Sequence, residues 1–364
     1  MNNLKIVSLT KNSLEKAVLE NKYWSGSYEP PFSLNKAKWM LKNTRADEED
    51  VLAVLCYEGY GIVAFVSLVP DLINTKDGLK KIFWSQRWWV SDKYKETVLS
   101  TYVKNMSLNE CDNQVIIKFL GDKSKAYYEK QSFTKFSKRE RYIILFSLDY
   151  ELLIYKKNSF KKIASILKLI DGFSRRIVAV INKRKSRKKS KDINYERVQL
   201  IDDDTWRFIE KNCSNDIVPK SKEYINWQIT NNQYHVIDDN ANKLEYKCLL
   251  GTISKKIYNL NIVVKHNNEI VGFISGFVSR NRFIVRYFIT TETYYNDSVN
   301  IMIKNLISSK CTILQTENNK LGEHVIGNYF KVYADVKELI SLIHDDVTVN
   351  FENSIMTDQD GNFF

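Results

Sequence analysis

The sequence predicts an α/β protein made of two tandem units, each a mixed sheet flanked by helices. Residues 31–43 and 219–231 share Pro, Ser, Trp and Asn without a gap, at an offset of 188 residues. Residues 62–67 and 270–275 form a second matching pair in the same order. The predicted helices and strands also follow one order in both halves. Such self-similarity indicates a tandem duplication.

In the first half, Pro31 and Ser33 favour a helix start, because proline suits the first turn and serine caps free backbone N–H groups. Runs rich in Val, Ile, Phe and Trp indicate strands. The predicted order is strand 4–9, helices 12–20 and 33–42, strands 51–57, 62–69 and 82–90, helix 95–108, strand 114–120, helix 123–130 and strand 141–148.

The second half repeats this order. We expect strand 195–201, helices 203–212 and 220–230, strands 258–265, 270–279 and 282–290, helix 296–309, strand 311–317 and helix 320–328. The region after residue 328 has a weaker pattern. The repeat predicts an N-terminal domain at 1–150 and a C-terminal domain at 193–364.

The segment 151–192 is predicted to be a basic amphipathic helical linker. Residues 155–191 hold fourteen Lys or Arg and a single acid, Asp171, which accounts for the net charge of +12 of the whole chain. The like-charged block 182–191 is expected to stay extended. Apolar residues recur at helical spacing: Phe160, Ile163, Leu167, Ile170, Ile177 and Ile181.

Composition excludes several classes of protein. No run of about 18 apolar residues is present to span a membrane, and the start does not resemble a signal peptide. We therefore expect a cytoplasmic protein, or one peripheral to the inner membrane face. The four histidines have no ligand or triad spacing, so no metal site is expected. Scattered cysteines, odd in number, indicate reduced thiols: Cys56, Cys111, Cys213, Cys248 and Cys311.

Near the C-terminus, Asp358-Gln-Asp360-Gly361 faintly resembles the start of a calcium-binding loop. Such a loop needs a Glu further along the chain. The chain has no Glu in that position, so calcium binding is not expected.

Residues 125–133 resemble the late helix and turn of the GNAT acyltransferase superfamily. The matching positions are Ala126, Tyr128, Glu129, Lys130 and Phe133. The order of elements in each half is also similar to that family. The resemblance implies a tandem GNAT-like fold and transfer of an acyl group from acetyl-CoA or another acyl-CoA.

The family's glycine-rich turn, which holds the coenzyme A pyrophosphate at a helix N-terminus, is degraded in both halves. In the first half, Glu96 and Val98 replace the expected glycines. In the second half, residues 288–298 contain no glycine. The resemblance therefore predicts fold more firmly than activity.

The resemblance implies Tyr128 as the acid that protonates the departing thiolate, with Asp92 or Glu292 as the base. The alternatives are a packed aromatic for Tyr128 and ordinary turn acids for the two carboxylates. Residues expected to contact the coenzyme are Val90, Lys93, Lys95, Thr97 and Asn318. For Lys93 and Lys95, the alternative is a solvated turn. For the repeated Trp39 and Trp227, a shared fold constraint is the simplest explanation.

Together these observations predict an N- or O-acyltransferase. The preferred acceptor is a sugar, sugar nucleotide or related amine in envelope polysaccharide assembly. A first alternative is a catalytically silent double unit that binds a carrier, a partner or a membrane surface. A second is a Fem-type transferase that uses aminoacyl-tRNA.

The basic linker has its own candidate partners. Its cations are expected to dock on an anionic membrane surface or a lipid-linked phosphosugar. The alternative is a helix lying between the two units with a solvated basic tail. Nucleic acid binding is disfavoured, because the basic block has no interleaved aromatics for base stacking.

Overall fold

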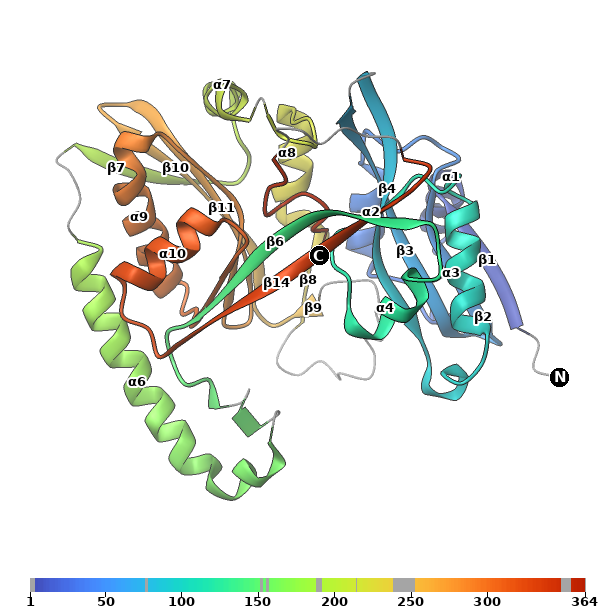
Figure 1. Ribbon diagram of the computed structural model, residues 1–364, viewed down its shortest axis with the longest axis horizontal. Helices are drawn as coiled ribbons and strands as arrows, with labels where there is room; N and C mark the ends of the chain where they lie inside the picture. The colour runs from blue at the N-terminus through green and yellow to red at the C-terminus, as the bar shows by residue number, and fades with distance from the viewer. Residues whose placement is uncertain are drawn as a thin grey trace.

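The computed structural model shows an α/β protein with two lobes (Figure 1). It describes residues 4–75, 78–150, 153–154, 157–187, 192–213, 215–237, 253–347 and 355–363. The prediction for Cys248 and that for the basic residues 188–191 fall outside these ranges.

The first half follows the predicted order of elements closely. Its short helix 92–94 and the helix after it replace the single helix expected from residue 95. The elements are β1 (Leu4–Thr10), α1 (Lys11–Leu19), α2 (Leu34–Leu41), β2 (Val51–Glu58), β3 (Gly61–Thr75), β4 (Gly78–Val90), η1 (Asp92–Tyr94), α3 (Leu99–Asn109), β5 (Val115–Ile117), α4 (Asp122–Tyr128) and β6 (Phe133–Leu145).

A connecting helix leads to the second half, which has the same succession. The elements are η2 (Asn158–Ile163), α6 (Ala164–Lys185), β7 (Ile193–Val198), α7 (Asp203–Asn212), α8 (Lys222–Ile229), η3 (Asn231–Gln233), β8 (His235–Val236), β9 (Ile253–Ser254), β10 (Ile257–His266), β11 (Glu269–Ser279), β12 (Arg282–Thr290), η4 (Glu292–Tyr294), α9 (Tyr295–Ser308), β13 (Ile313–Thr316), α10 (Asn319–Asn328) and β14 (Tyr333–His344).

Both halves have the same strand topology, which confirms the predicted tandem fold. Strands β1 to β4 form an antiparallel meander, and β5 joins β4 in parallel. Strands β7, β10, β11 and β12 form the matching meander, and β13 joins β12 in parallel. Among the described residues, one twelve-stranded sheet has the order β1-β2-β3-β4-β5-β14-β6-β13-β12-β11-β10-β7.

The two halves exchange their last strands. Strand β6 of the first half pairs with β13 of the second, and β14 of the second half pairs with β5 of the first. Strands β6 and β14 also pair with each other along their whole length and cross between the lobes (Figure 1). Each half of the sheet therefore includes a strand from the other. The domain boundaries at 1–150 and 193–364 therefore stay a prediction.

The sequence did not predict β14, and it placed the start of β6 at residue 141 instead of Phe133. Residues 133–140 are mostly polar and exposed or half-buried, since this ribbon bridges the lobes. Its cross-strand pairs include the exposed ion pair Lys138–Glu338. A strand without an apolar face lacks the alternation by which strands are recognised.

The repeated tryptophans meet between the lobes. The rings of Trp39 on α2 and Trp227 on α8 stack at a centroid distance of 4.2 Å. Both side chains are buried, and Phe363 packs on both. This contact supports the structural interpretation of the pair.

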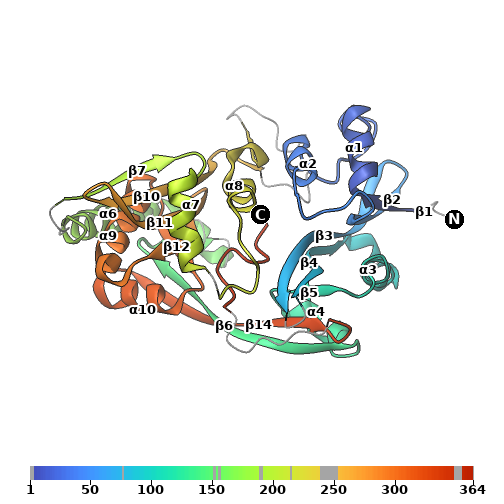
Figure 2. The same cartoon turned by 90° about the horizontal axis from the view of Figure 1, so that it is seen from above.

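The C-terminal segment 355–363 lies between the two lobes (Figure 2). Gly361 has a φ of +63°, and an added Cβ would lie 2.6 Å from the ring of Trp84. Its carbonyl accepts a hydrogen bond of 2.9 Å from Gln86 on β4. From the second half, the Thr316 hydroxyl donates a hydrogen bond of 2.6 Å to Asp358. Both lobes therefore take part in holding this segment.

Helix α6 runs along the outer side of the second half, next to α9 (Figure 1). The interpretation that it lies between the two units is therefore not what the structure shows. The expectation of an extended block at 182–191 was wrong for residues 182–185, which form the last turn of α6. No helix in the described part of the chain is long and apolar enough to cross a membrane.

Candidate functional site

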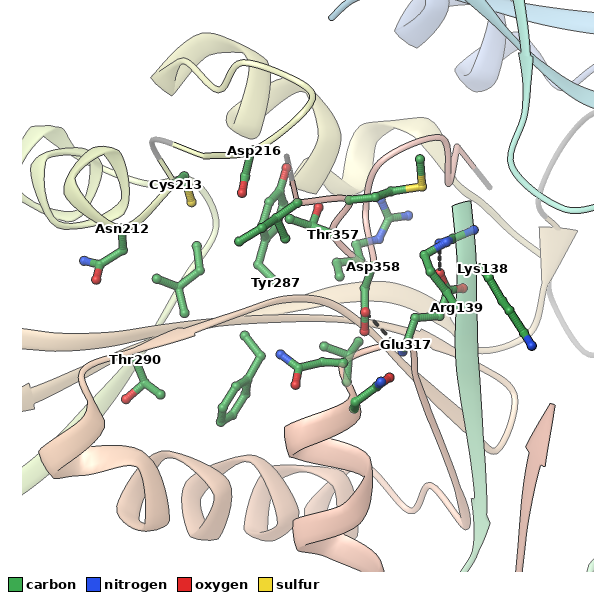
Figure 3. A pocket seen from close by; sticks show the side chains of 18 residues that line it. Lys138, Arg139, Asn212, Cys213, Asp216, Tyr287, Thr290, Glu317, Thr357 and Asp358 are labelled. Atoms are coloured by element: carbon green, nitrogen blue, oxygen red, sulfur yellow. Dashed lines mark hydrogen bonds and ion pairs between the residues drawn. The ribbon is translucent and has the colours of Figure 1, made fainter. Parts of the chain in front are cut away.

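Strands β12 and β13 open a cavity where they separate. They pair in parallel only from Arg282 opposite Ile313 to Ile284 opposite Gln315. Beyond that point, residues 285–290 of β12 and 317–319 line a cavity of about 490 Å³ (Figure 3). This stretch of β12 therefore presents a strand edge toward the cavity.

The other walls come from distant parts of the chain. Lys138 and Arg139 belong to the exchanged strand β6, so the first half contributes to a cavity of the second. The loop after α7 and the C-terminal segment close the remaining sides. Their lining residues are Asn212, Cys213, Asp216, Ile355, Met356, Thr357 and Asp358.

One wall carries a buried group of charges around Glu317. Its carboxylate pairs with Arg139, with Arg141 at 2.9 Å and with Lys118 at 3.5 Å. Burial opposes ionisation, but the three cations together lower the pKa of Glu317, so it stays charged. Nε of both arginines has no hydrogen-bond partner among the described residues.

Asp358 adds a partial negative charge to this wall. Its carboxylate accepts hydrogen bonds from the Thr316 hydroxyl at 2.6 Å and the Glu317 backbone N–H at 3.0 Å. Burial, reinforced by Glu317, raises its pKa to about 7. Three cations therefore surround one fully ionised and one partly ionised carboxylate, so this buried group keeps a net positive charge. Arg139, Glu317 and Asp358 are the members that line the cavity.

Asp216 is a carboxyl group suited to proton transfer. It is 6% exposed, and its Oδ2 lies 3.7 Å from Lys220 Nζ but has no hydrogen-bond partner among the described residues. Lys220 instead pairs closely with Asp360. Burial, followed by the charge of Asp360, raises the pKa of Asp216 to about 7. Such a group exchanges a proton near neutral pH.

Cys213 lies beside Asp216 on the same wall (Figure 3). Burial and the nearby Asp216 carboxylate raise the pKa of its thiol. It is therefore a thiol at neutral pH and lacks the thiolate that a cysteine nucleophile requires.

Of the residues predicted from the sequence, Asn318 lines this cavity. Its side chain also caps α10 by accepting a hydrogen bond of 2.9 Å from Leu321 N–H. Glu292 lies in η4, after β12, and pairs with Lys320 at 2.5 Å. It is exposed and does not line the cavity.

The first-half residues predicted from the sequence gather at one exposed turn after β4. Val90 ends that strand, and Lys93 pairs with Glu58 at 2.5 Å. Lys95 pairs with Asp92. The Thr97 hydroxyl donates to the Tyr94 carbonyl at 2.8 Å.

The turns of the two halves are equivalent but far apart in the sheet. The Ser91 N–H donates to Val63 O at 2.8 Å, and the Thr291 N–H donates to Val271 O at 3.0 Å. Strands β5, β14, β6 and β13 lie between β4 and β12. The structure therefore does not bring Asp92 and Glu292 together, and their catalytic roles stay predictions.

Tyr128 is 4% exposed and lies in an aromatic cluster. Its ring meets those of Trp88, Tyr127 and Phe133 edge-on, at centroid distances of 5.1 to 6.1 Å. Burial raises its pKa, so the phenol stays protonated. It borders a separate cavity of about 210 Å³. The surroundings suit a packed aromatic, and its acid role stays a prediction.

No family model matches the sequence, and no curated protein sequence matches it. Two solved structures of Saccharomyces cerevisiae N-myristoyltransferase with bound myristoyl-CoA are similar, each with a TM-score of 0.52. At 11% identity, one match covers 94% of this chain and 79% of that chain. At 10% identity, the other covers 98% and 90%.

A GCN5-related N-acetyltransferase from Anabaena variabilis matches with a TM-score of 0.48 and 8% identity, covering 93% of this chain and 72% of that chain. The likeness to the myristoyltransferase structures confirms the tandem GNAT-like fold.

Three residues of the cavity were not predicted from the sequence: Asp216, Asp358 and Arg139. They come from three separate segments of the chain, which only the fold brings together.

Proposed function

We propose that this protein transfers an acyl group from acyl-coenzyme A to an amine or hydroxyl, and that the reaction takes place in the cavity between β12 and β13. The observation that carries the proposal is an open strand edge that shares a cavity with a carboxyl group of near-neutral pKa. Proteins of similar fold, the yeast N-myristoyltransferases, bind myristoyl-CoA.

The strand edge suits the donor. The pantetheine arm of coenzyme A contains two amides, which can pair with backbone groups of a strand edge as an added strand would. Residues 285–290 supply such an edge, and α9 begins shortly after it. The N-terminus of α9 would then favour the pyrophosphate. Asn318 would contact the same ligand from the opposite side.

The first-half turn is the alternative donor site. Val90, Lys93, Lys95 and Thr97 would contact the coenzyme there, with Asp92 as base and Tyr128 as acid. The ion pairs of Lys93 and Lys95 within the turn would have to open, because both ammonium groups already have carboxylate partners. We therefore prefer the second half.

In the preferred site, Asp216 is the base. The acceptor nitrogen or oxygen attacks the thioester carbonyl carbon, and its proton passes to Asp216. The carbon–sulfur bond then breaks, and coenzyme A leaves as a thiolate that takes up the proton from Asp216, which restores the base. A base with a pKa of about 7 is ionised for a large part of the protein near neutral pH.

The electropositive wall indicates the acceptor class. Arg139 lines the cavity and keeps a buried Nε that has no hydrogen-bond partner among the described residues. Guanidinium groups suit phosphate and carboxylate oxygens. A sugar nucleotide or another phosphorylated sugar would complement this wall, in keeping with a role in polysaccharide assembly.

The experiment measures binding of acetyl-CoA and myristoyl-CoA by calorimetry and by the rise in melting temperature that a ligand of the folded state causes. Asn318→Asp keeps a side chain that caps helices equally well but adds a negative charge at the cavity. We expect it to weaken acyl-CoA binding by about fivefold or more. The matched variant Thr97→Asp adds the same charge to the first-half turn and should bind as the unaltered protein does.

If Thr97→Asp weakened acyl-CoA binding and Asn318→Asp left it unchanged, the donor site would lie in the first half. Absence of binding by either acyl-CoA would overturn the proposed function. It would then favour the silent binding unit or the aminoacyl-tRNA transferase.

A further inference from the structure

Helix α6 carries an exposed apolar stripe. Leu169 is 75% exposed, Phe173 68% and Ile166 57%. Spacings of three and four residues place the stripe on one face of the helix. Its six members are Ile166, Leu169, Ile170, Phe173, Ile177 and Val180. A contiguous exposed stripe of this kind indicates an interaction surface, unlike single exposed apolar residues.

The opposite side of α6 is fixed to the second half. Val178 is buried in the second-half core. The Asn182 side chain donates to the Phe330 carbonyl at 2.8 Å and accepts from the Phe330 N–H at 2.9 Å. These contacts set the rotation of the helix about its axis, so the apolar stripe faces away from the protein.

Cations flank the stripe, and α6 exposes no carboxylate. Arg176, Lys183 and Arg184 are exposed on the helix, within about a quarter turn of the stripe. The single acid of α6, Asp171, is 3% exposed. It accepts a hydrogen bond from the Asp149 backbone N–H at 3.0 Å and pairs with Arg175 at 3.1 Å. The exposed surface of α6 is therefore apolar and positively charged.

We propose that this face of α6 docks the protein on an anionic bilayer, with the apolar stripe inserted among the lipid headgroups and acyl chains. Helices that lie in a membrane interface combine such a stripe with basic flanks. Each cation near an acidic leaflet adds electrostatic attraction. A second copy of the chain is a poorer occupant, because symmetrical contact would bring two sets of basic side chains together.

The test is flotation of the full chain with vesicles of phosphatidylglycerol mixed with phosphatidylcholine, compared with vesicles of phosphatidylcholine alone. We expect binding to the anionic vesicles and little binding to the neutral ones. The double variant Leu169→Ser/Phe173→Ser should bind at least about 10-fold more weakly, since each side chain loses apolar contact with the lipid. Arg176→Gln/Arg184→Gln should weaken binding and reduce its dependence on salt.

The matched control is Leu19→Ser, at a residue 80% exposed on α1 in the other lobe. It should bind vesicles as the unaltered protein does, and unchanged melting temperatures should show that all variants are folded. Equal binding to neutral and anionic vesicles would overturn the proposal. So would unchanged binding by the double serine variant, or a dimer that the same variant converts to a monomer.

Discussion

Trp39 and Trp227 each donate the indole N–H to the backbone carbonyl of the other. The two hydrogen bonds are 2.7 Å and 2.8 Å long. Because the residues occupy equivalent positions in the two halves, the contact is self-complementary, as at the interface of a symmetric dimer. One residue type at one position of the ancestral unit thus supplies both sides of the contact.

Trp39→Phe should destabilise the protein by about 1–3 kcal/mol, because it removes one donor and leaves the Trp227 carbonyl buried without it. Trp227→Phe should cost a similar amount. Urea unfolding of both single variants and of the double variant measures the coupling between them. Purely additive losses would contradict the reciprocal contact.

Gly322 on α10 tests the exchange of β6 between the halves. An added Cβ would lie 2.2 Å from Tyr142 Cγ, and Tyr142 belongs to β6. Gly322→Ala should therefore destabilise the protein by about 1–3 kcal/mol through overpacking. At Gly327, on the same helix, an added Cβ would meet no atom within 4 Å. Gly327→Ala should be neutral, or stabilising by up to about 1 kcal/mol; thermal unfolding distinguishes the two variants.

Glu317→Gln should destabilise the protein by about 3–5 kcal/mol, because Lys118, Arg139 and Arg141 would lose their buried charged partner. The pKa of Glu317 is lowered in the folded protein, so its stabilising effect is present above the ordinary pKa of Glu and is lost as the pH falls below it. The exposed Glu338 offers the control. Glu338→Gln breaks only the surface pair with Lys138 and should change stability by less than about 1 kcal/mol.

Asp216 should make stability fall as the pH rises. An unfolded Asp titrates near about pH 3.9, whereas the folded group titrates at about 7. Between these values the folded state binds more protons than the unfolded state, so the free energy of unfolding decreases with pH. Asp216→Asn should remove this contribution, which reaches at most about 1.4 kcal/mol per pH unit.

The same variant tests catalysis. Loss of the base should lower kcat by about 10²- to 10⁴-fold. In the unaltered protein, kcat should rise with pH through about 7, as Asp216 ionises. A variant that is folded and fully active would remove Asp216 from the mechanism.

Most of the fold could be predicted from the sequence, because the elements inside each lobe carry apolar faces. The helices and the meander strands lie close to their predicted ranges. Strand β14 and the first half of β6 could not be found in this way. They form a ribbon whose stability comes from pairing between distant segments, which local composition does not record.

Less of the candidate site than of the fold could be predicted from the sequence. Asn318 was predicted from the resemblance to the late helix of the GNAT family, counted back from Phe330, and it lines the cavity. Asp216 and Arg139 have no local signature, since the strand exchange and a loop bring them together. The Asp358-to-Gly361 motif resembles a calcium loop, but its two acids have other partners. They bond Thr316 and pair with Lys220 inside the protein.

The exchange of last strands also has a consequence for synthesis. Strand β5 pairs with β4 on one side and with β14, near the end of the chain, on the other. While a ribosome is still making the second half, the β5 edge of the sheet in the newly made N-terminal lobe has no partner strand. An unpaired sheet edge of this kind is prone to pairing with other nascent chains. The N-terminal lobe can reach its final form only after translation has passed residue 344.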